Sequence, residues 1–269
     1  MTKSHRPQMN YNAPKAHGLF DPKREFDACG VGFIANMSGE RSHKIIENAL
    51  FILENLEHRG AVGADPLAGD GAGLLLQIPH QLLAPECESL GFTLPAVGEY
   101  AVGQLFMPQD DRLRAHCSTV WNRICEEQGF DVIGWREVPV DNSKLSDTVR
   151  ETEPAHWQIF LAKPKAAKGQ DDFERRLYLV RKIVSNAIYN AYKGRDIGHY
   201  TVSLSSRTIV YKGMFLSYQV REYFKDVTDP RMASALALVH QRFSTNTFPS
   251  WKLAHPYRMV AHNGEINTL

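Results

Sequence analysis

A cysteine among glycines is the feature of this sequence best suited to covalent chemistry. Cys29 lies in the stretch Asp27-Ala28-Cys29-Gly30-Val31-Gly32-Phe33-Ile34, at the start of a short apolar run. Glycines let a backbone or a substrate approach closely, so a thiol beside them can act as a nucleophile held on a rigid element. The same pattern also suits a buried cysteine that packs as a small apolar side chain. The octapeptide alone does not decide between the two interpretations.

A second segment has the composition of a carboxylate-binding site. It reads Gln241-Arg242-Phe243-Ser244-Thr245-Asn246-Thr247 and places an arginine between a predicted strand and a run of hydroxyl and amide side chains. A guanidinium group donates two parallel hydrogen bonds to a carboxylate, and the side chains that follow can add more. The alternative interpretation is a solvated arginine in a polar turn.

A third segment, His262-Asn263-Gly264-Glu265, places an Asn-Gly pair directly after an apolar stretch. Such a pair usually forms a turn. It can also form an oxyanion hole, in which the Asn263 amide and the Gly264 backbone N–H donate to a developing negative oxygen. Together with Cys29 and Arg242, the pair completes a nucleophile, a carboxylate anchor and an oxyanion stabiliser. This combination predicts attack on the side-chain amide of an amino acid.

Two other kinds of site fit the sequence less well. His240, His255 and His262 do not have the spacing of metal ligands, and no cysteine lies near them in the sequence, so we predict no metal site. The glycine-rich stretches at 60–65 and 69–73 precede a predicted strand rather than a helix, and no Gly-Lys-Ser/Thr follows them. We therefore expect tight turns beside an active site rather than a phosphate-binding loop.

Strands and amphipathic helices are expected to position these residues. Helices with one apolar face are predicted over 42–59, 110–129 and 172–192, the first with Ser42 as N-cap and the last with Asp171 and Glu174 as a capping box. A hairpin is predicted around 205–207, and the first strand is expected to be buried. Strands are predicted over 31–35, 74–78, 101–106, 132–140, 157–162, 200–204, 208–212, 236–240 and 259–262. Because helices fall in clusters between runs of strands, the predicted class is α+β, with sheets covered by helices.

The composition is that of an ordinary globular protein, with 269 residues, 43% hydrophobic residues and a net charge of +1. This small charge provides no bulk attraction to nucleic acid or to anionic lipid. The four cysteines include no Cys-x-x-Cys pair, which argues against a zinc ribbon or a disulfide framework and favours a reducing cytoplasm. Cys117 and Cys125 fall in a predicted helix and are interpreted as packing residues. We find no signal peptide and no apolar run long enough to span a membrane.

Five separate blocks carry a resemblance to a known family. They are Asp27-Ala28-Cys29-Gly30-Val31-Gly32-Phe33, Glu57-His58-Arg59-Gly60, Gly69-Asp70-Gly71-Ala72-Gly73, Gln241-Arg242-Phe243-Ser244-Thr245-Asn246-Thr247 and His262-Asn263-Gly264-Glu265-Ile266-Asn267. In this order they resemble the class II glutamine amidotransferase domain of the glutamate synthase family, in its bacterial large-chain form. The resemblance covers residues 18–269. It implies an N-terminal-nucleophile hydrolase fold, a four-layer α/β/β/α sandwich with two facing antiparallel sheets.

The resemblance implies that the chain is processed at Cys29. Residues 1–28 would be a leader that is cut off between Ala28 and Cys29, and residues 29–269 would be the amidotransferase domain. A free α-amino group has a pKa of about 7.7–8.0 and can relay a proton for the thiol beside it. A cysteine thiol with the usual pKa of about 8.5 is only a weak nucleophile at neutral pH without such help.

The resemblance also assigns a role to each candidate residue. Cys29 would attack the side-chain carbonyl of L-glutamine, while Asn263 and Gly264 would hold the oxyanion. Arg242, with Thr245 nearby, would bind the α-carboxylate. Loss of ammonia and hydrolysis of the resulting thioester would then give glutamate.

Partners and cofactors are implied only for a longer enzyme. The resemblance implies that ammonia passes to 2-oxoglutarate, that further domains of the large chain carry FMN and a 3Fe-4S iron–sulfur cluster, and that a small subunit carries FAD and NADPH. None of these cofactors is expected within this chain. We expect the domain to be incomplete at its C-terminus, with the residue that binds the substrate ammonium group beyond Leu269. Two alternatives stay open: a class II amidotransferase with another ammonia acceptor, and a truncated fragment without catalytic activity.

Overall fold

Two antiparallel sheets of four strands form the centre of this computed structural model, which describes residues 29–60, 65–244 and 248–258. One sheet has the strand order β1-β8-β2-β7, with β1 at Gly30–Ala35, β8 at Leu236–Gln241, β2 at Ala72–Gln77 and β7 at Thr208–Gly213. The other has the order β4-β5-β3-β6, with β4 at Val132–Glu137, β5 at Ala155–Ala162, β3 at Tyr100–Met107 and β6 at Tyr200–Ser205. The predicted α+β class with two antiparallel sheets is confirmed.

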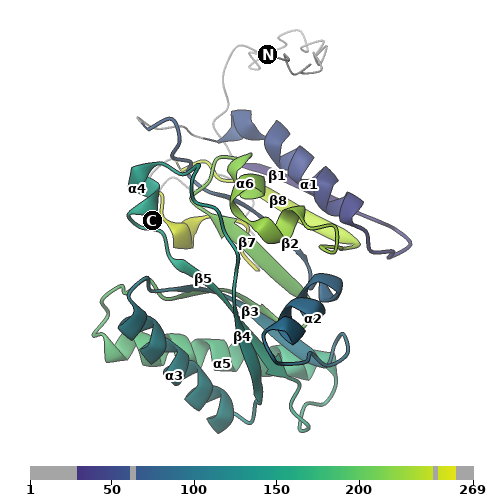
Figure 1. The fold of residues 1–269 in the computed structure, drawn as a ribbon, viewed down its shortest axis with the longest axis vertical. Helices are drawn as coiled ribbons and strands as arrows, with labels where there is room; N and C mark the ends of the chain where they lie inside the picture. The colour runs from purple at the N-terminus through teal and green to yellow at the C-terminus, as the bar shows by residue number, and fades with distance from the viewer. Residues whose placement is uncertain (1–28, 61–64, 245–247, 259–269) are drawn as a thin grey trace, which may run out of the picture.

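Helices lie on opposite sides of the two sheets (Figure 1). The helix α1 (His43–Asn55) runs along β1 and β8 and buries Ile46, Ala49 and Leu53. The helices α3 (Asp111–Glu127) and α5 (Gln170–Ala191) cover the second sheet, where they form an apolar core with the outer faces of β3 and β5. The shorter elements are α2 (His80–Ser89), α4 (Asp147–Arg150), α6 (Gln219–Tyr223) and the 3-10 turns η1 (Glu57–Arg59), η2 (Lys225–Thr228) and η3 (Trp251–Leu253).

The strands β6 and β7 connect the two sheets. The turn between them falls where the sequence predicts a hairpin, but β6 forms its ladder with β3, and β7 forms its ladder with β2. The carboxylate of Glu174 supports this corner, because it accepts a hydrogen bond of 2.7 Å from the Ser206 backbone N–H. The predicted capping box of α5 is therefore wrong: the helix begins after Gly169 without a side-chain cap, and Glu174 reaches the β6–β7 turn instead.

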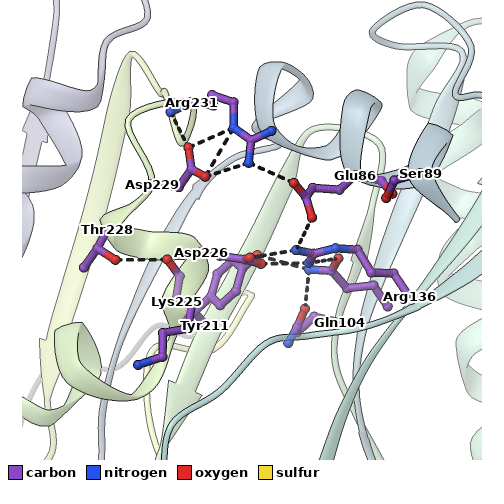
Figure 2. Close-up of polar contacts among 11 residues, drawn as sticks. Glu86, Ser89, Gln104, Arg136, Tyr211, Lys225, Asp226, Thr228, Asp229 and Arg231 are labelled. Carbon is purple, nitrogen blue, oxygen red and sulfur yellow. Dashed lines mark hydrogen bonds and ion pairs between the residues drawn. The ribbon is translucent and has the colours of Figure 1, made fainter.

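A buried ion pair ties the second sheet to the segment between β7 and β8 (Figure 2). Arg136 on β4 donates hydrogen bonds of 2.7 and 2.8 Å to the two carboxylate oxygens of Asp226 in η2. The hydroxyl of Tyr211 on β7 donates to the same carboxylate at 2.9 Å, and Gln158 on β5 contacts both Arg136 and Tyr211. Because these residues come from both sheets, the network fixes the position of one sheet relative to the other.

The strand β1 differs from the buried strand that the sequence predicts. Gly32 faces α1, since a Cβ atom there would lie 2.5 Å from the Ile52 side chain. Alternation along the strand places Val31 and Phe33 on the opposite face, where they are 60% and 75% exposed. The described elements therefore cover one face of β1 and leave the apolar side chains of the other face in contact with solvent.

Candidate active site

The pairing of β1 with β8 brings Cys29 beside the segment that contains Arg242. The two strands are antiparallel with Gly30 opposite Gln241, so the residue before β1 lies next to the residues after β8. The Cys29 Sγ accepts a hydrogen bond of 3.4 Å from the Phe243 backbone N–H and lies 3.7 Å from the Phe243 carbonyl oxygen. Two segments more than 200 residues apart in the chain thus meet at the thiol.

The exposure of Cys29 separates it from the other cysteines. Cys29 is exposed, whereas Cys87, Cys117 and Cys125 are buried. Burial raises the pKa of these three thiols to about 12, 11 and 12, respectively. The interpretation of Cys117 and Cys125 as packing residues is confirmed, and the interpretation of Cys29 as a buried apolar side chain is wrong. Cys29 is the only accessible thiol among the described residues.

The glycines beside Cys29 make room for a helix rather than for a substrate. A Cβ atom on Gly30 would lie 3.0 Å from the Arg59 side chain and 3.1 Å from that of Leu56. The glycines of the first block thus allow α1 and η1 to pack directly on β1. The resulting contact gives Cys29 a rigid support on one side while leaving its Sγ accessible.

The segment 69–71, which directly precedes β2, forms a bracket of hydrogen bonds around Arg242. The Arg242 backbone N–H donates to the Gly71 carbonyl at 2.8 Å, and its Nη1 donates to the Asp70 carbonyl at 3.2 Å. The Ser244 backbone N–H donates to the Asp70 carboxylate. Arg242 itself is 7% exposed, so its guanidinium group is held in a defined position rather than solvated in a turn. Of the two glycine-rich stretches for which tight turns were expected, residues 61–64 lie outside the described residues, and Ala72 and Gly73 are the first residues of β2 rather than part of a turn.

The carboxyl group of Asp70 is a functional candidate that the sequence argument did not assign. It is 8% exposed. Burial raises the pKa of Asp70, while the hydrogen bond from the Ser244 backbone and the charge of Arg242 oppose that change. The sequence held no signal for this burial, because it comes from the packing of the segment that contains Arg242 and Ser244 against Asp70.

Lys212 is a second residue near Arg242 that the sequence argument missed. It is 1% exposed, and its Nζ donates to the carbonyl oxygens of Lys252 at 2.9 Å and of Ala254 at 2.6 Å. The rings of Tyr200 and Tyr257 lie 5.0 and 4.4 Å from the same atom. Burial, with a smaller repulsion from Arg242, lowers the pKa of Lys212 to about 7.

Lys212 fixes the position of the segment 252–254 next to the bracket. A Cβ atom on Gly71 would lie 2.8 Å from Ala254, so this glycine and this alanine pack in direct contact. Since Gly71 also accepts the backbone hydrogen bond of Arg242, the anchored segment and the arginine share one support. The strand pattern gave no signal for this role, because a lysine near the end of a strand is usually solvated.

Three of the five predicted site residues lie outside the described residues. These are Thr245, Asn263 and Gly264. The structure brings Cys29 and Arg242 to the same end of the β1–β8 pair, which places a thiol and a buried guanidinium group on one rigid support. The arrangement suits covalent attack on a substrate that carries a carboxylate.

Clusters of metal-ligating side chains and membrane-spanning helices are both absent from the described residues. Nowhere in 29–60, 65–244 and 248–258 does a group of three or more His, Cys, Asp or Glu side chains gather as a metal site. The rings of His240 and His255 lie with their centroids 4.4 Å apart, and His262 lies outside the described residues. Among the helices of the described part, none has the length and apolar character needed to cross a bilayer.

Comparisons with known proteins assign a family to almost the whole chain. The family model described as "Glutamine amidotransferases class-II" matches residues 29–269. The glutamate synthase [NADPH] large chain of Bacillus subtilis is 44% identical over 262 residues, which is 97% of this chain and 17% of that protein. The glutamate synthase [NADH] of Schizosaccharomyces pombe is 43% identical over 95% of this chain and 12% of that protein. The ferredoxin-dependent glutamate synthase 2 of Arabidopsis thaliana is 41% identical over 95% of this chain and 16% of that protein. The chain thus spans less than a fifth of the length of these relatives.

Proposed function

The chain belongs to the class-II glutamine amidotransferases, and from this premise we propose that residues 29–269 hydrolyse L-glutamine to L-glutamate and ammonia with Cys29 as nucleophile. One observation carries the proposal. Cys29 is the first residue of the family match, and its exposed Sγ lies against the Phe243 backbone, one residue from the buried Arg242. A reactive cysteine needs both access to substrate and a fixed neighbourhood, and Cys29 has both.

In the proposed reaction, the leader of residues 1–28 is removed between Ala28 and Cys29 before the first turnover. Cleavage frees the α-amino group of Cys29, and an α-amino group with a pKa of about 7.7–8.0 can exchange protons at neutral pH. This amine takes the proton of the thiol during attack and returns it to the leaving nitrogen.

The bonds change in two steps. First, Sγ forms a bond to the side-chain carbonyl carbon of glutamine, and the Asn263 amide and the Gly264 N–H stabilise the negative oxygen that develops. The carbon–nitrogen bond then breaks, ammonia leaves with the returned proton, and a γ-glutamyl thioester remains. In the second step, water adds to the thioester and the carbon–sulfur bond breaks, which releases glutamate and restores the thiol.

Substrate recognition in this proposal depends on the α-carboxylate. Arg242, with Thr245 beside it, donates hydrogen bonds to that carboxylate. The Gly71 carbonyl holds the backbone of Arg242, and the Asp70 carbonyl holds its guanidinium group, so the position of the anchor is defined. Because the reacting carbon lies at the other end of the glutamine side chain, a fixed carboxylate places that carbon over Sγ.

We further propose that the domain supplies ammonia to a synthase within a longer protein, because the relatives it matches are named glutamate synthases. In that protein ammonia is transferred to 2-oxoglutarate, with FMN and an iron–sulfur cluster in other domains and with FAD and NADPH on a small subunit. Within the described residues no group of three or more ligand side chains gathers, and Cys87 lies in a different apolar core from Cys117 and Cys125.

Glutamine hydrolysis by two alanine variants tests the role of Cys29. Cys29→Ala should lower the rate at least about 10³-fold, because the nucleophile is lost. Cys117→Ala is the matched control, since it removes the same group from a buried position in α3 and should keep the rate. Circular dichroism establishes that both variants fold. Glutaminase activity in the folded Cys29→Ala variant would overturn the proposal.

A pair of chains tests the role of the leader. One chain starts with Met-Cys29, from which the methionine is trimmed, and the other carries a leader that cannot be cut. Intact mass measurement establishes the N-terminus of each. The first chain should hydrolyse glutamine and the second should not, because only the first has a free amine on Cys29. Equal rates would contradict the proposed proton relay.

A further inference from the structure

A basic cavity of about 460 Å³ lies between the C-terminal half of α5 and the start of β6, and its lining includes none of the residues proposed to act in glutamine hydrolysis. Arg181 and Ser185 line it from α5, and Tyr200 and Thr201 line it from β6. Arg195 from the loop between these elements and Lys252 from η3 complete the wall. Its volume is in the range of pockets that hold small metabolites.

Two buried polar atoms in this wall have no hydrogen-bond partner among the described residues. They are Nε of Arg181 and Oγ1 of Thr201. Thr201 is 5% exposed, so water in bulk solvent does not satisfy its hydroxyl group. Buried donors in folded proteins are nearly always paired, which indicates that an acceptor occupies this cavity in the working protein.

The charge of the wall is positive. Arg181, Arg195 and Lys252 line it, and Arg258, which is outside the lining, lies over the same Tyr178 ring as Arg181, at 6.0 and 5.2 Å from its centroid, respectively. In the part of the chain that the structure describes, no ion pair involves Arg181, Arg195 or Arg258. The single carboxylate in the lining belongs to Asp196, and it pairs with Lys252. The positive charge of the arginines is therefore not neutralised from within the described residues.

The remaining polar groups of the wall do not oppose an anion. His199 accepts a hydrogen bond of 3.0 Å from Trp121 through Nε2, and burial lowers the pKa of His199 to about 4, so the ring is neutral. The last carbonyls of α5 are also satisfied, since the backbone N–H groups of Tyr192 and Gly194 donate to Ile188 and Tyr189. The negative end of the helix is thus capped rather than directed into the cavity.

We propose that this cavity binds a small dianion, with the guanidinium groups of Arg181 and Arg195 and the hydroxyl of Thr201 as its donors. Guanidinium groups bind phosphate and carboxylate groups by two parallel hydrogen bonds, and the Thr201 hydroxyl group can donate one more hydrogen bond to the same anion. The ligand class is therefore a phosphate group or a dicarboxylate. The site is independent of glutamine hydrolysis and stands whether or not Cys29 is the nucleophile.

Calorimetric titration of the full chain at pH 7.5 with inorganic phosphate and, separately, with succinate tests the proposal, with ionic strength held constant by sodium chloride. Arg181→Gln should weaken binding by about 10- to 100-fold, as expected for a lost charged hydrogen bond. Thr201→Val keeps the shape of the side chain and should weaken binding a few-fold. Arg175→Gln is the matched control, because it removes the same charge from a position on α5 whose side chain is 71% exposed. This control should bind as the wild type does.

Saturable binding of either probe that depends on Arg181 supports the site, and the stronger probe tells whether the ligand class is a phosphate or a dicarboxylate. If Arg181→Gln fails to fold, Arg195→Gln on the exposed loop provides the same test. Absence of saturable binding by both probes would overturn the proposal. An equal loss in Arg175→Gln would also overturn it, because binding would then reflect the overall charge of the helix.

Discussion

Two buried cations, one on each sheet, are compensated in opposite ways. Arg136 on β4 is 3% exposed and faces the carboxylate of Asp226, with which it forms two hydrogen bonds (Figure 2). Lys212 on β7 is 1% exposed, but its Nζ donates to backbone carbonyls and lies near aromatic rings. No ion pair of Lys212 occurs within the described ranges. The charge of Arg136 is therefore balanced by a carboxylate, whereas the described contacts of the Lys212 ammonium group are with carbonyl dipoles and aromatic rings.

The difference in compensation has opposite consequences for the pKa. For Arg136, burial disfavours the charge, but the hydrogen bonds and attraction of Asp226 outweigh burial and raise the pKa further. For Lys212, burial dominates and lowers the pKa to about 7. Arg136 stays charged at all pH values of interest, and its ion pair serves the fold. Lys212 changes its charge near neutral pH, and it does so beside the candidate substrate anchor Arg242.

The largest effect is expected from breaking the compensated pair. Asp226→Ala leaves Arg136 buried without its carboxylate and should lower the free energy of unfolding by about 3–5 kcal/mol. The matched control is Asp229→Ala in the same segment, because its partner Arg231 has a side chain that is 44% exposed. That control should cost less than about 1 kcal/mol in urea unfolding. Equal losses in the two variants would show that burial of the ion pair does not matter here.

The next effect should separate binding from folding. Arg242→Gln removes the proposed carboxylate anchor and should lower kcat/KM for glutamine about 10- to 100-fold, mainly through KM, since one charged hydrogen bond contributes about 1.5–3 kcal/mol. Its free energy of unfolding should change less than that of Asp226→Ala. Steady-state glutaminase kinetics provide the measurement. A KM equal to that of the wild type would remove Arg242 from substrate binding.

Lys212→Met is expected to have a smaller effect on folding. At pH 10 the lysine amine is neutral, so the variant loses only the hydrogen bonds to the carbonyls of Lys252 and Ala254. Leaving buried carbonyls unpaired should cost about 1–3 kcal/mol in urea unfolding. A cost as large as that of Asp226→Ala would mean that Lys212 has a stronger partner than backbone dipoles.

The pH dependence sharpens the comparison further. The native pKa of Lys212 is about 7, and the pKa of an unfolded lysine is about 10.4. Between these values the unfolded chain binds more protons than the native chain, so the contribution of Lys212 to stability rises with pH and is lost as pH falls toward 7. The cost of Lys212→Met should therefore shrink by up to about 1.4 kcal/mol for each pH unit between 9 and 7.

Asp226→Ala provides the control for this titration. Because the pKa of Arg136 is raised, its charge does not change between pH 7 and 9, and the cost of losing Asp226 should stay constant over that range. Unfolding in urea at several pH values gives both curves. If the loss of unfolding free energy in Lys212→Met did not change with pH, this would contradict a pKa of about 7 for the buried Lys212 amine.

Much of the fold could be predicted from periodicity alone. The long helices were found because each has an apolar face of several turns, as in α3, which begins at Asp111 with Asp110 as its cap. The helix α2 was missed because it is short and contains Pro85, which disfavours a helix interior. Ser42 precedes α1 as predicted, but its side chain forms no cap, since its backbone pairs with Ser234 instead.

From the sequence, only those residues of the candidate site could be predicted whose side chains are reactive or bind ligands whatever their surroundings. Cys29 and Arg242 could be singled out because a thiol and a guanidinium group carry chemistry by themselves, but each also had an ordinary alternative, a packing cysteine and a solvated arginine, that only the structure excludes. Asp70 and Lys212 could not, because their importance comes from burial, and burial depends on which distant segments pack against them. The close packing of Gly71 against Ala254 is an example. The two residues are 183 positions apart in the sequence, so no local sequence pattern could predict their contact.

The most direct test of the account is covalent labelling by 6-diazo-5-oxo-L-norleucine, a reactive analogue of glutamine. The leader-free chain is incubated with the analogue, and the modified peptide is located by mass spectrometry. We expect one adduct, on the Sγ of Cys29, that excess L-glutamine prevents and that Arg242→Gln weakens. An adduct on another cysteine, or labelling of Cys29 that glutamine does not reduce, would contradict the account.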